Sequence, residues 1–218
     1  MINRLIIVLM IIISLLIVSW LNPAPQPSQP VESRFVKLNQ FGEPMRPWEG
    51  PWSCVLDNKT GLIWENKTDN ESIHDGYWSY SWYDENVGTP NLGDCYFEAN
   101  RCDVMDLVNR TNKSALCGRS DWRLPSENEL ITLVERSFPQ GHLQINPVFF
   151  PNTKKGDYWT SNHSQPLSGG FKHLHEGASA INFLDGRIRK LPYRNAAFVR
   201  MVTEVSKKSH TKLASSPP

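Results

Sequence analysis

The clearest structural signal in the sequence reads Leu116-Cys117-Gly118-Arg119-Ser120-Asp121-Trp122-Arg123-Leu124-Pro125-Ser126-Glu127-Asn128-Glu129-Leu130. Pro125 restricts the residue before it to extended backbone, so one element ends there and another can begin. Ser126 can cap a helix, and Glu129, three residues later, can close a capping box. Apolar residues follow at helical spacing, so we expect a helix from about Glu127 to Arg136 that buries Leu130, Leu133 and Val134.

The patterns on both sides of this stretch predict strands. Two stretches are typical of hairpins, because extended runs flank a turn: residues 54–65 around Asp57 to Gly61, and residues 180–191 around Asp185-Gly186. Further extended segments are expected at residues 34–38, 78–83, 158–161 and 197–202, and a second helix at about 96–113. Strands at both ends of the domain, with two helices between them, indicate an α+β fold with an antiparallel sheet.

The N-terminus carries an apolar run from Leu5 to Leu21 that only two serines interrupt. As a helix this run spans roughly 25 Å, just enough to cross a thin hydrocarbon core. Two interpretations compete, an uncleaved signal anchor over residues 1–21 and a cleaved signal peptide. We favour the anchor, because the run is longer than a typical signal core and Val18 to Pro23 offers no good cleavage site.

The charges around this run predict its orientation. Arg4 precedes the run and residues 22–33 contain neither Lys nor Arg, so the N-terminus should stay in the cytoplasm while the rest is exported. Residues 22–33 contain four prolines and indicate an extended linker. One domain over residues 34–205 and a disordered polar tail over 206–218 should follow. We expect an inner-membrane anchor with a periplasmic domain, or a secreted or cell-surface protein if the leader is cleaved.

All four cysteines lie in the part expected to be exported, where thiols oxidise. Four cysteines allow three connectivities, of which we favour Cys54–Cys117 with Cys95–Cys102. The second pair would fasten the entry to a helix, and the first would close a long loop worth roughly 4 kcal/mol on the chain-entropy model. The alternative is a structural zinc site, which the absence of any Cys-x-x-Cys pair disfavours.

The net charge of +1 conceals an uneven distribution. Residues 40–106 contain thirteen acidic and four basic residues, whereas residues 172–212 contain nine basic and three acidic ones. The basic end includes Arg187, Arg189, Lys190 and Arg194, which form a candidate site for an acidic or sulfated polysaccharide. The alternatives are a solvated outer face that pairs with the acidic half, and contact with a membrane surface.

Other candidate sites in the sequence are weaker. Asp69, Asn70, Glu71 and Asp75 could offer oxygen ligands to calcium, although they lack EF-hand spacing, and otherwise form a solvated loop. Arg123 could stack on Trp122 or pair with Asp121 at a pinned corner of the fold. The aromatic residues Trp64, Trp82 and Trp159 should build the core, with sugar stacking as the alternative. The sequence has no serine-nucleophile elbow and no phosphate-binding glycine loop, so it assigns no catalytic residues and no cofactor.

Several fragments together resemble one family. They are Thr60 to Glu65, Tyr80 to Tyr83, Leu116 to Leu130, Phe149 to Thr153, Tyr158 to Ser161 and Phe198 to Val202. In order and spacing they resemble the C-terminal domain of the Legionella collagen-like protein (Lcl), a family long called a domain of unknown function. The resemblance implies an exported bacterial protein with a fold related to C-type-lectin-like and formylglycine-generating-enzyme-like domains. It also implies a link to adhesion through sulfated glycosaminoglycans, although this chain has no Gly-x-y repeat.

These observations favour a non-catalytic, membrane-anchored binding module outside the cytoplasm. Its partners would be the membrane, through residues 5–21, and an acidic polysaccharide or another protein of the envelope or cell surface. We expect no nucleic-acid partner. The alternative is a structural or accessory subunit of an envelope assembly without a small ligand, and an envelope enzyme is the third hypothesis.

Overall fold

A computed structural model describes residues 33–95 and 101–205 of the chain. The chain divides into residues 1–33 and 34–218, and every element below belongs to the second unit. The expected anchor over residues 5–21, the linker apart from Ser33, and the tail over 206–218 lie outside the described residues. Within the described stretches, no helix combines the length and the apolar character that crossing a bilayer requires.

The first sheet contains four antiparallel strands in the order β1 (Phe35–Leu38), β2 (Cys54–Asp57), β3 (Leu62–Glu65) and β10 (Val202–Glu204). The hairpin expected at residues 54–65 is present as β2 and β3. Asp57 begins its turn by accepting a hydrogen bond from the backbone N–H of Lys59, and Gly61 supplies the left-handed φ of +71° that the turn needs. All four β3 side chains are buried, so this strand crosses the interior of the domain.

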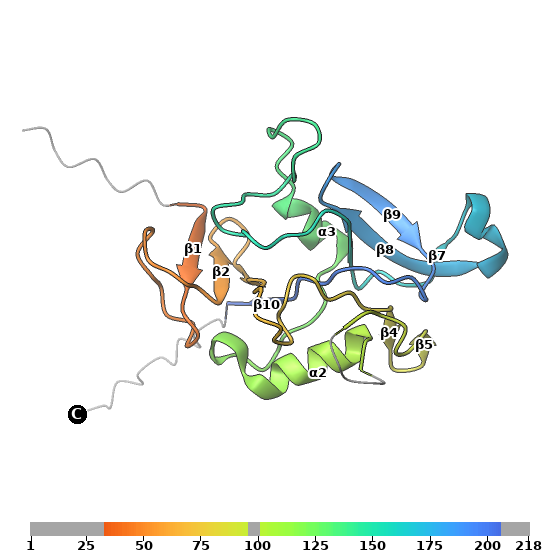
Figure 1. The fold of residues 1–218 in the computed structure, drawn as a ribbon, viewed down its shortest axis with the longest axis horizontal. Coiled ribbons are helices and arrows are strands. Elements are labelled where there is room, and N and C mark those ends of the chain that lie inside the picture. The colour runs from red at the N-terminus through yellow and green to blue at the C-terminus, as the bar shows by residue number, and fades with distance from the viewer. Residues whose placement is uncertain (1–32, 96–100, 206–218) are drawn as a thin grey trace, which may run out of the picture. The chain divides into compact units, whose positions relative to one another are not determined.

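The second sheet is built on β8 (Glu176–Asn182), which pairs antiparallel with each of its neighbours. These are β6 (Asp157–Trp159), β7 (Gln165–Pro166) and β9 (Arg187–Leu191). The hairpin expected at residues 180–191 is present as β8 and β9. Figure 1 shows β8 and β9 side by side, with β7 near the end of the hairpin away from its turn. A short pair, β4 (Tyr83–Asp84) and β5 (Val87–Gly88), completes the strands among the described residues.

The helices differ from expectation at their ends. Helix α2 runs over Val104–Ser114, because Asp103 accepts a hydrogen bond from the backbone N–H of Asp106 and caps it there. The expected start at residue 96 is wrong, since the Cys95–Cys102 disulfide occupies the chain just before the helix; residues 96–100 lie outside the described part.

The predicted capping box is present at the start of helix α3 (Glu127–Leu130). A 3-10 turn, η2 (Ile131–Leu133), continues the helix, and extended backbone at Val134 ends it before the expected Arg136.

Two expected strands are replaced largely by isolated bridges. Residues 78–83 pair through single bridges at Ser79, Tyr80 and Ser81, each with a different partner segment, so no continuous ladder forms. The last regular strand begins at Val202, whereas the expectation placed it over residues 197–202. In both segments neighbouring residues bond to different elements, so no continuous ladder forms over the expected range.

The interior contains two clusters of buried apolar side chains. Trp82 and Trp159 belong to the first cluster and Trp64 to the second, so all three build the core as expected. Two disulfides, Cys54–Cys117 and Cys95–Cys102, brace the domain, and the first joins β2 to the segment after α2. The observed architecture is therefore a mixed α+β fold with antiparallel sheets and few helices.

Candidate functional site

The basic residues singled out in the sequence are exposed on and just after β9. Arg187, Arg189 and Lys190 lie on the strand and Arg194 follows it. Arg187 and Arg189 share a sheet face, since they pair with Asn182 and Ala180 of β8. On its other side β9 pairs with no described strand, so this row of basic residues follows a sheet edge.

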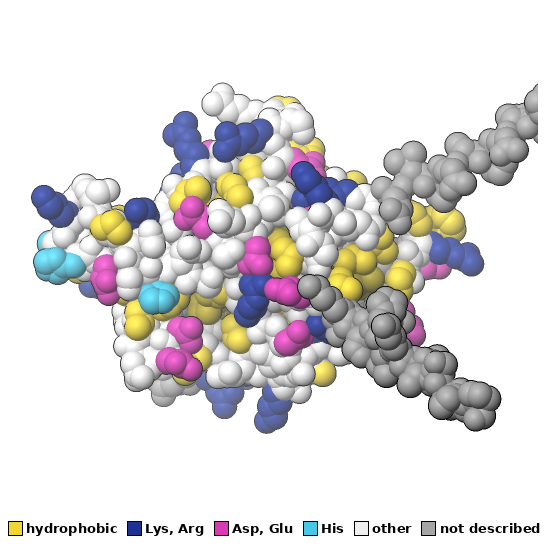
Figure 2. Space-filling model, turned by 180° about the vertical axis from the view of Figure 1, so that it is seen from behind, with side chains coloured by type: hydrophobic (Ala, Val, Ile, Leu, Met, Phe, Trp, Pro, Cys, Tyr) yellow, Lys and Arg dark blue, Asp and Glu magenta, His cyan; other side chains and the backbone are white. Residues whose placement is uncertain are grey.

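Acidic neighbours already neutralise one of these residues. The guanidinium of Arg189 lies 2.8 Å from Asp185 Oδ2 and 3.4 Å from Asp157 Oδ1. Arg189 therefore attracts an anionic ligand less strongly than its exposure alone would indicate. Figure 2 shows basic and acidic side chains interspersed on the face that it presents, with no single broad basic patch there.

The candidate calcium ligands, Asp69, Asn70, Glu71 and Asp75, lie in one loop, which two of their side chains stabilise. Both carboxylate oxygens of Asp75 accept backbone hydrogen bonds, Oδ2 from Glu71 and Oδ1 from Tyr77. Asn70 Oδ1 accepts one from the backbone N–H of Ser72. These oxygens hold the loop in shape, and no group of three or more metal-binding side chains occurs within the described residues.

A buried ionic cluster lies where this loop meets β3. Glu65 is fully buried; its Oε1 accepts hydrogen bonds from Lys67 Nζ at 2.9 Å and from His74 Nδ1 at 2.8 Å, and its Oε2 accepts one from the backbone N–H of Met201. Burial alone would raise the pKa of Glu65, but Lys67, His74 and the Met201 amide outweigh it and lower the pKa to about 2. The carboxyl group is therefore ionised at neutral pH.

Arg200 extends the cluster from the other side. It belongs to the basic end of the sequence, residues 172–212, yet its side chain is completely buried. It donates to the carbonyl oxygen of Glu65 and to Thr153 Oγ1, and its guanidinium lies 4.8 Å from the ring centroid of Phe150. Its burial lowers the pKa of Arg200. Arg200 thus fastens the chain before β10 to β3 and is not available to a surface ligand.

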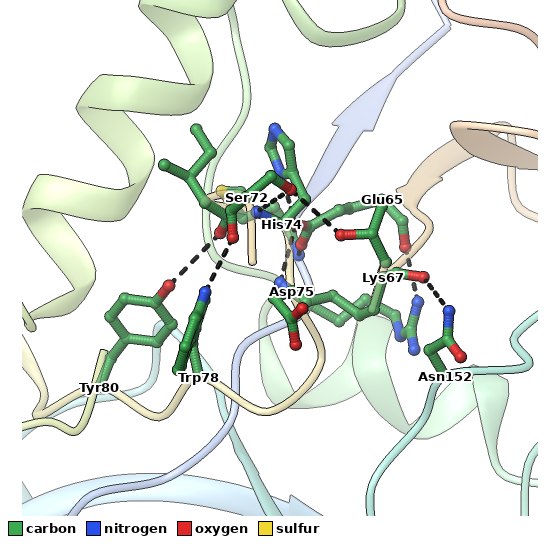
Figure 3. Close-up of polar contacts among 12 residues, drawn as sticks. Glu65, Lys67, Ser72, His74, Asp75, Trp78, Tyr80 and Asn152 are labelled. Atoms are coloured by element: carbon green, nitrogen blue, oxygen red, sulfur yellow. Dashed lines mark hydrogen bonds and ion pairs between the residues drawn. The ribbon is translucent and has the colours of Figure 1, made fainter. Parts of the chain in front are cut away.

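The loop over residues 66–78 is held at many points around this cluster (Figure 3). Trp78 donates its indole N–H and Tyr80 its hydroxyl to carbonyl oxygens of Ser72 and Ile73, while Asn152 Nδ2 donates to the carbonyl oxygen of Lys67. The first two bonds hold the loop internally, and the third brings it against the segment around Asn152. A rigid frame of this kind can keep a binding surface in shape.

A pocket of about 470 Å³ opens beside the cluster. Its walls include Trp52, Asn66, Lys67 and His74, with Asn70 at an exposed position. Pockets that bind small molecules typically measure about 300 to 1,000 Å³. The lining combines an aromatic ring with donors and acceptors, so the pocket is suited to a small polar ligand.

Comparison with known proteins places the domain in a family. The Lcl C-terminal domain family model matches residues 53–203. The chain belongs to the Lcl C-terminal domain family. No curated protein and no solved structure matches the chain. The match to the Lcl C-terminal domain includes the buried cluster, most of the pocket wall and all of the basic β9 residues.

The corner around Asp121 to Glu129 has a structural role in this Lcl C-terminal domain. Arg123 does not pair with Asp121; it forms two bonds of 2.7 and 2.8 Å with Glu129 and a further one with Glu204. Arg119 takes the pairing with Asp121 instead. The hydrogen bond from Arg123, only partly opposed by burial, lowers the pKa of Glu129 to about 2. A cavity of about 430 Å³ lies beside this corner, but the guanidinium that lines it is already bound.

Sequence reasoning missed the Glu65 cluster. A signal was present, because Glu65 ends the otherwise apolar run Leu62-Ile63-Trp64, and Lys67 follows two residues later. A charged residue at a buried strand end requires a partner. The contribution of His74 and Arg200 depends on loop geometry and on distant pairing, which the sequence pattern does not encode.

Proposed function

We propose that this protein is a non-catalytic binding module of the bacterial cell envelope. Membership of the Lcl C-terminal domain family supports a surface or secreted binding role. The apolar residues 5–21 support a membrane anchor, and the two disulfides support an oxidising location such as the periplasm or cell surface. The mixed α+β architecture is compatible with a lectin-like domain.

The proposed ligand is an acidic or sulfated polysaccharide. The observation that carries this proposal is the row of exposed basic side chains at a sheet edge, Arg187, Arg189, Lys190 and Arg194. An extended polyanion lying along β9 would reach side chains from both faces of the strand. Arg187, Lys190 and Arg194 would supply most of the attraction, because Arg189 is shared with two carboxylates.

Retention on a heparin column tests this proposal. We expect the full chain to be retained and to elute with salt. Replacement of Arg187, Lys190 and Arg194 by glutamine should weaken binding at least about threefold, because each exposed ion pair contributes about 0.2 to 1 kcal/mol. The matched control replaces the exposed Lys59, Lys113 and Lys155, which removes the same charge elsewhere. Equal elution of the two variants would refute the assignment to β9.

The second candidate function is a structural or accessory subunit of an envelope assembly. It is favoured by the same edge strand, because lysine and arginine also protect exposed edges against pairing with other chains. In that case β9 would be only a solvated face. Crosslinking in intact cells, followed by capture of the full chain, should then recover a defined envelope protein, and the charge substitutions should leave its yield unchanged.

A further inference from the structure

We infer that the pocket beside the buried cluster binds a neutral, hydroxyl-rich ligand, a single sugar unit of the pyranose type. This site is separate from β9 and does not depend on the proposed polyanion binding. It rests on the unfilled hydrogen-bonding groups of the wall, on the charge of the cluster and on the aromatic ring at the rim.

The wall presents acceptors that need donors. Because the carboxylate of Glu65 can only accept, His74 Nδ1 must donate to it, and the other ring nitrogen of a neutral imidazole is then an acceptor. Among the described residues, Nε2 of His74 has no hydrogen-bond partner, and the side chain is 13 % exposed at the pocket wall.

Asn66 supplies a second acceptor of this kind. The residue is 8 % exposed, and its Nδ2 donates to the carbonyl oxygen of Trp52, which fixes the orientation of the amide. Its Oδ1 has no partner among the residues that the structure describes. A buried acceptor left without a donor is unfavourable, so a ligand hydroxyl that reached it would supply the missing hydrogen bond.

The charges exclude the main alternative ligands. The carboxylates of Glu65 and Asp75 balance the cations of Lys67 and Arg200, so the buried groups carry no net charge when His74 is neutral. A carboxylate or phosphate group brings no donor for the two acceptors and would meet the exposed side chain of Asp69 in the pocket wall, whereas a cationic group would meet the ammonium of Lys67 there. A neutral polyol offers donors and acceptors without either conflict.

The aromatic ring and the rim complete the match. Trp52 lines the pocket, and its indole N–H donates to the carbonyl oxygen of Phe149, which holds the ring in place. The ammonium of Lys37 lies 3.8 Å from the ring centroid and covers one face of the indole. The aromatic surface that remains suits the apolar C–H face of a sugar ring. The nearby hydroxyls of Thr68 and Ser72, 3.1 Å apart, can exchange hydrogen bonds with ligand hydroxyls.

Saturation-transfer NMR on the full chain tests this inference, with glucose, galactose, mannose and N-acetylglucosamine as neutral probes and glucuronate as the anionic one. We expect transfer to at least one neutral sugar at millimolar concentration. Asn66→Ala should weaken that binding about three- to tenfold. Asn70→Trp should abolish it by filling the mouth of the pocket, whereas Asn70→Ala, which removes the same hydrogen bond from the Ser72 amide without filling the mouth, should keep it. Asn70 lies outside the ionic cluster, so this pair of variants tests the site even if Asn66→Ala does not fold.

Gln140→Trp is the matched control, because it places the same ring at an exposed amide residue elsewhere. It should bind the sugar as the unmodified chain does. The inference is overturned if none of the four neutral sugars binds, if glucuronate binds more strongly than all of them, or if Asn70→Trp and Gln140→Trp behave alike. Heparin retention is measured on the same variants; it should stay unchanged, which keeps the two sites distinguishable.

Discussion

Replacing Glu65 with glutamine tests whether the buried cluster holds the domain together. The carboxylate accepts from Lys67, His74 and Met201, whereas an amide offers one acceptor oxygen and introduces an NH₂ donor. The ammonium of Lys67, whose side chain is 2 % exposed, would lose its negative partner. Glu65→Gln keeps the shape of the side chain, so packing changes contribute little to the outcome.

The expected loss follows from the two effects together. Removing one partner of a buried ion pair is unfavourable by about 3 to 5 kcal/mol, and a buried donor left unsatisfied by about 1 to 3 kcal/mol. Because these overlap at Lys67, we expect Glu65→Gln to lower the free energy of unfolding by about 3 to 5 kcal/mol. The double variant Glu65→Gln with Lys67→Met removes the orphaned charge and should recover about 2 kcal/mol or more.

Urea unfolding followed by tryptophan fluorescence, with disulfides intact, measures these differences. Glu176→Gln is the control, since it makes the same change at an exposed residue and should shift the free energy of unfolding by less than about 0.5 kcal/mol. A loss in Glu65→Gln no larger than in this control would show that the buried ion pair does not stabilise the domain. A double variant as unstable as the sum of its two single variants would show that Glu65 and Lys67 do not act as a pair.

Three further outcomes are expected. Because the native pKa of Glu65 is about 2 and its unfolded value about 4.5, its contribution of about 3 kcal/mol is present above pH 4.5 and is lost as the pH falls towards 2; urea midpoints across this range should decline less steeply in Glu65→Gln. Replacing Cys54 and Cys117 together by serine should lower stability by about 4 kcal/mol, since they lie 63 residues apart; the drop in the calorimetric Tm reports it. Gly177→Ala should lower stability by about 1 to 3 kcal/mol, because its Cβ would meet the carbonyl oxygen of Leu191; an unchanged urea midpoint would contradict this.

The parts of the fold that are specified locally could be predicted from the sequence. The capping box at Ser126 and Glu129 depends on residues three apart, and the two hairpins depend on short turns. The start of α2 was misplaced because a disulfide loop with helix-compatible residues precedes Asp103. The last strand was misplaced because its hydrogen bonds depend on β3, more than 130 residues away along the chain, and apolar periodicity does not encode a partner.

In the candidate sites too, the features that depend on neighbouring residues could be predicted, and those that depend on distant segments could not. The exposure of Arg187, Arg189 and Lys190 was foreseeable from their pattern on a strand, but the two carboxylates that hold Arg189 come from a turn and from β6. Lys67 and His74 meet on one oxygen only because the loop between them is folded by several backbone bonds. The pocket brings together residues near positions 52, 70 and 152, and nothing in local composition indicates that they meet.

The position of β10 has a consequence for the order of events during synthesis. This strand completes the first sheet, and the Met201 amide beside it fills the second oxygen of Glu65, yet both leave the ribosome more than 130 residues after β3. Until they arrive, the earlier half carries an open strand edge and a charged interior without its full set of partners. A nascent chain of this protein must therefore wait for residues 201–204 before the sheet can close, and truncation before Met201 should leave a species that proteases degrade and chaperones retain.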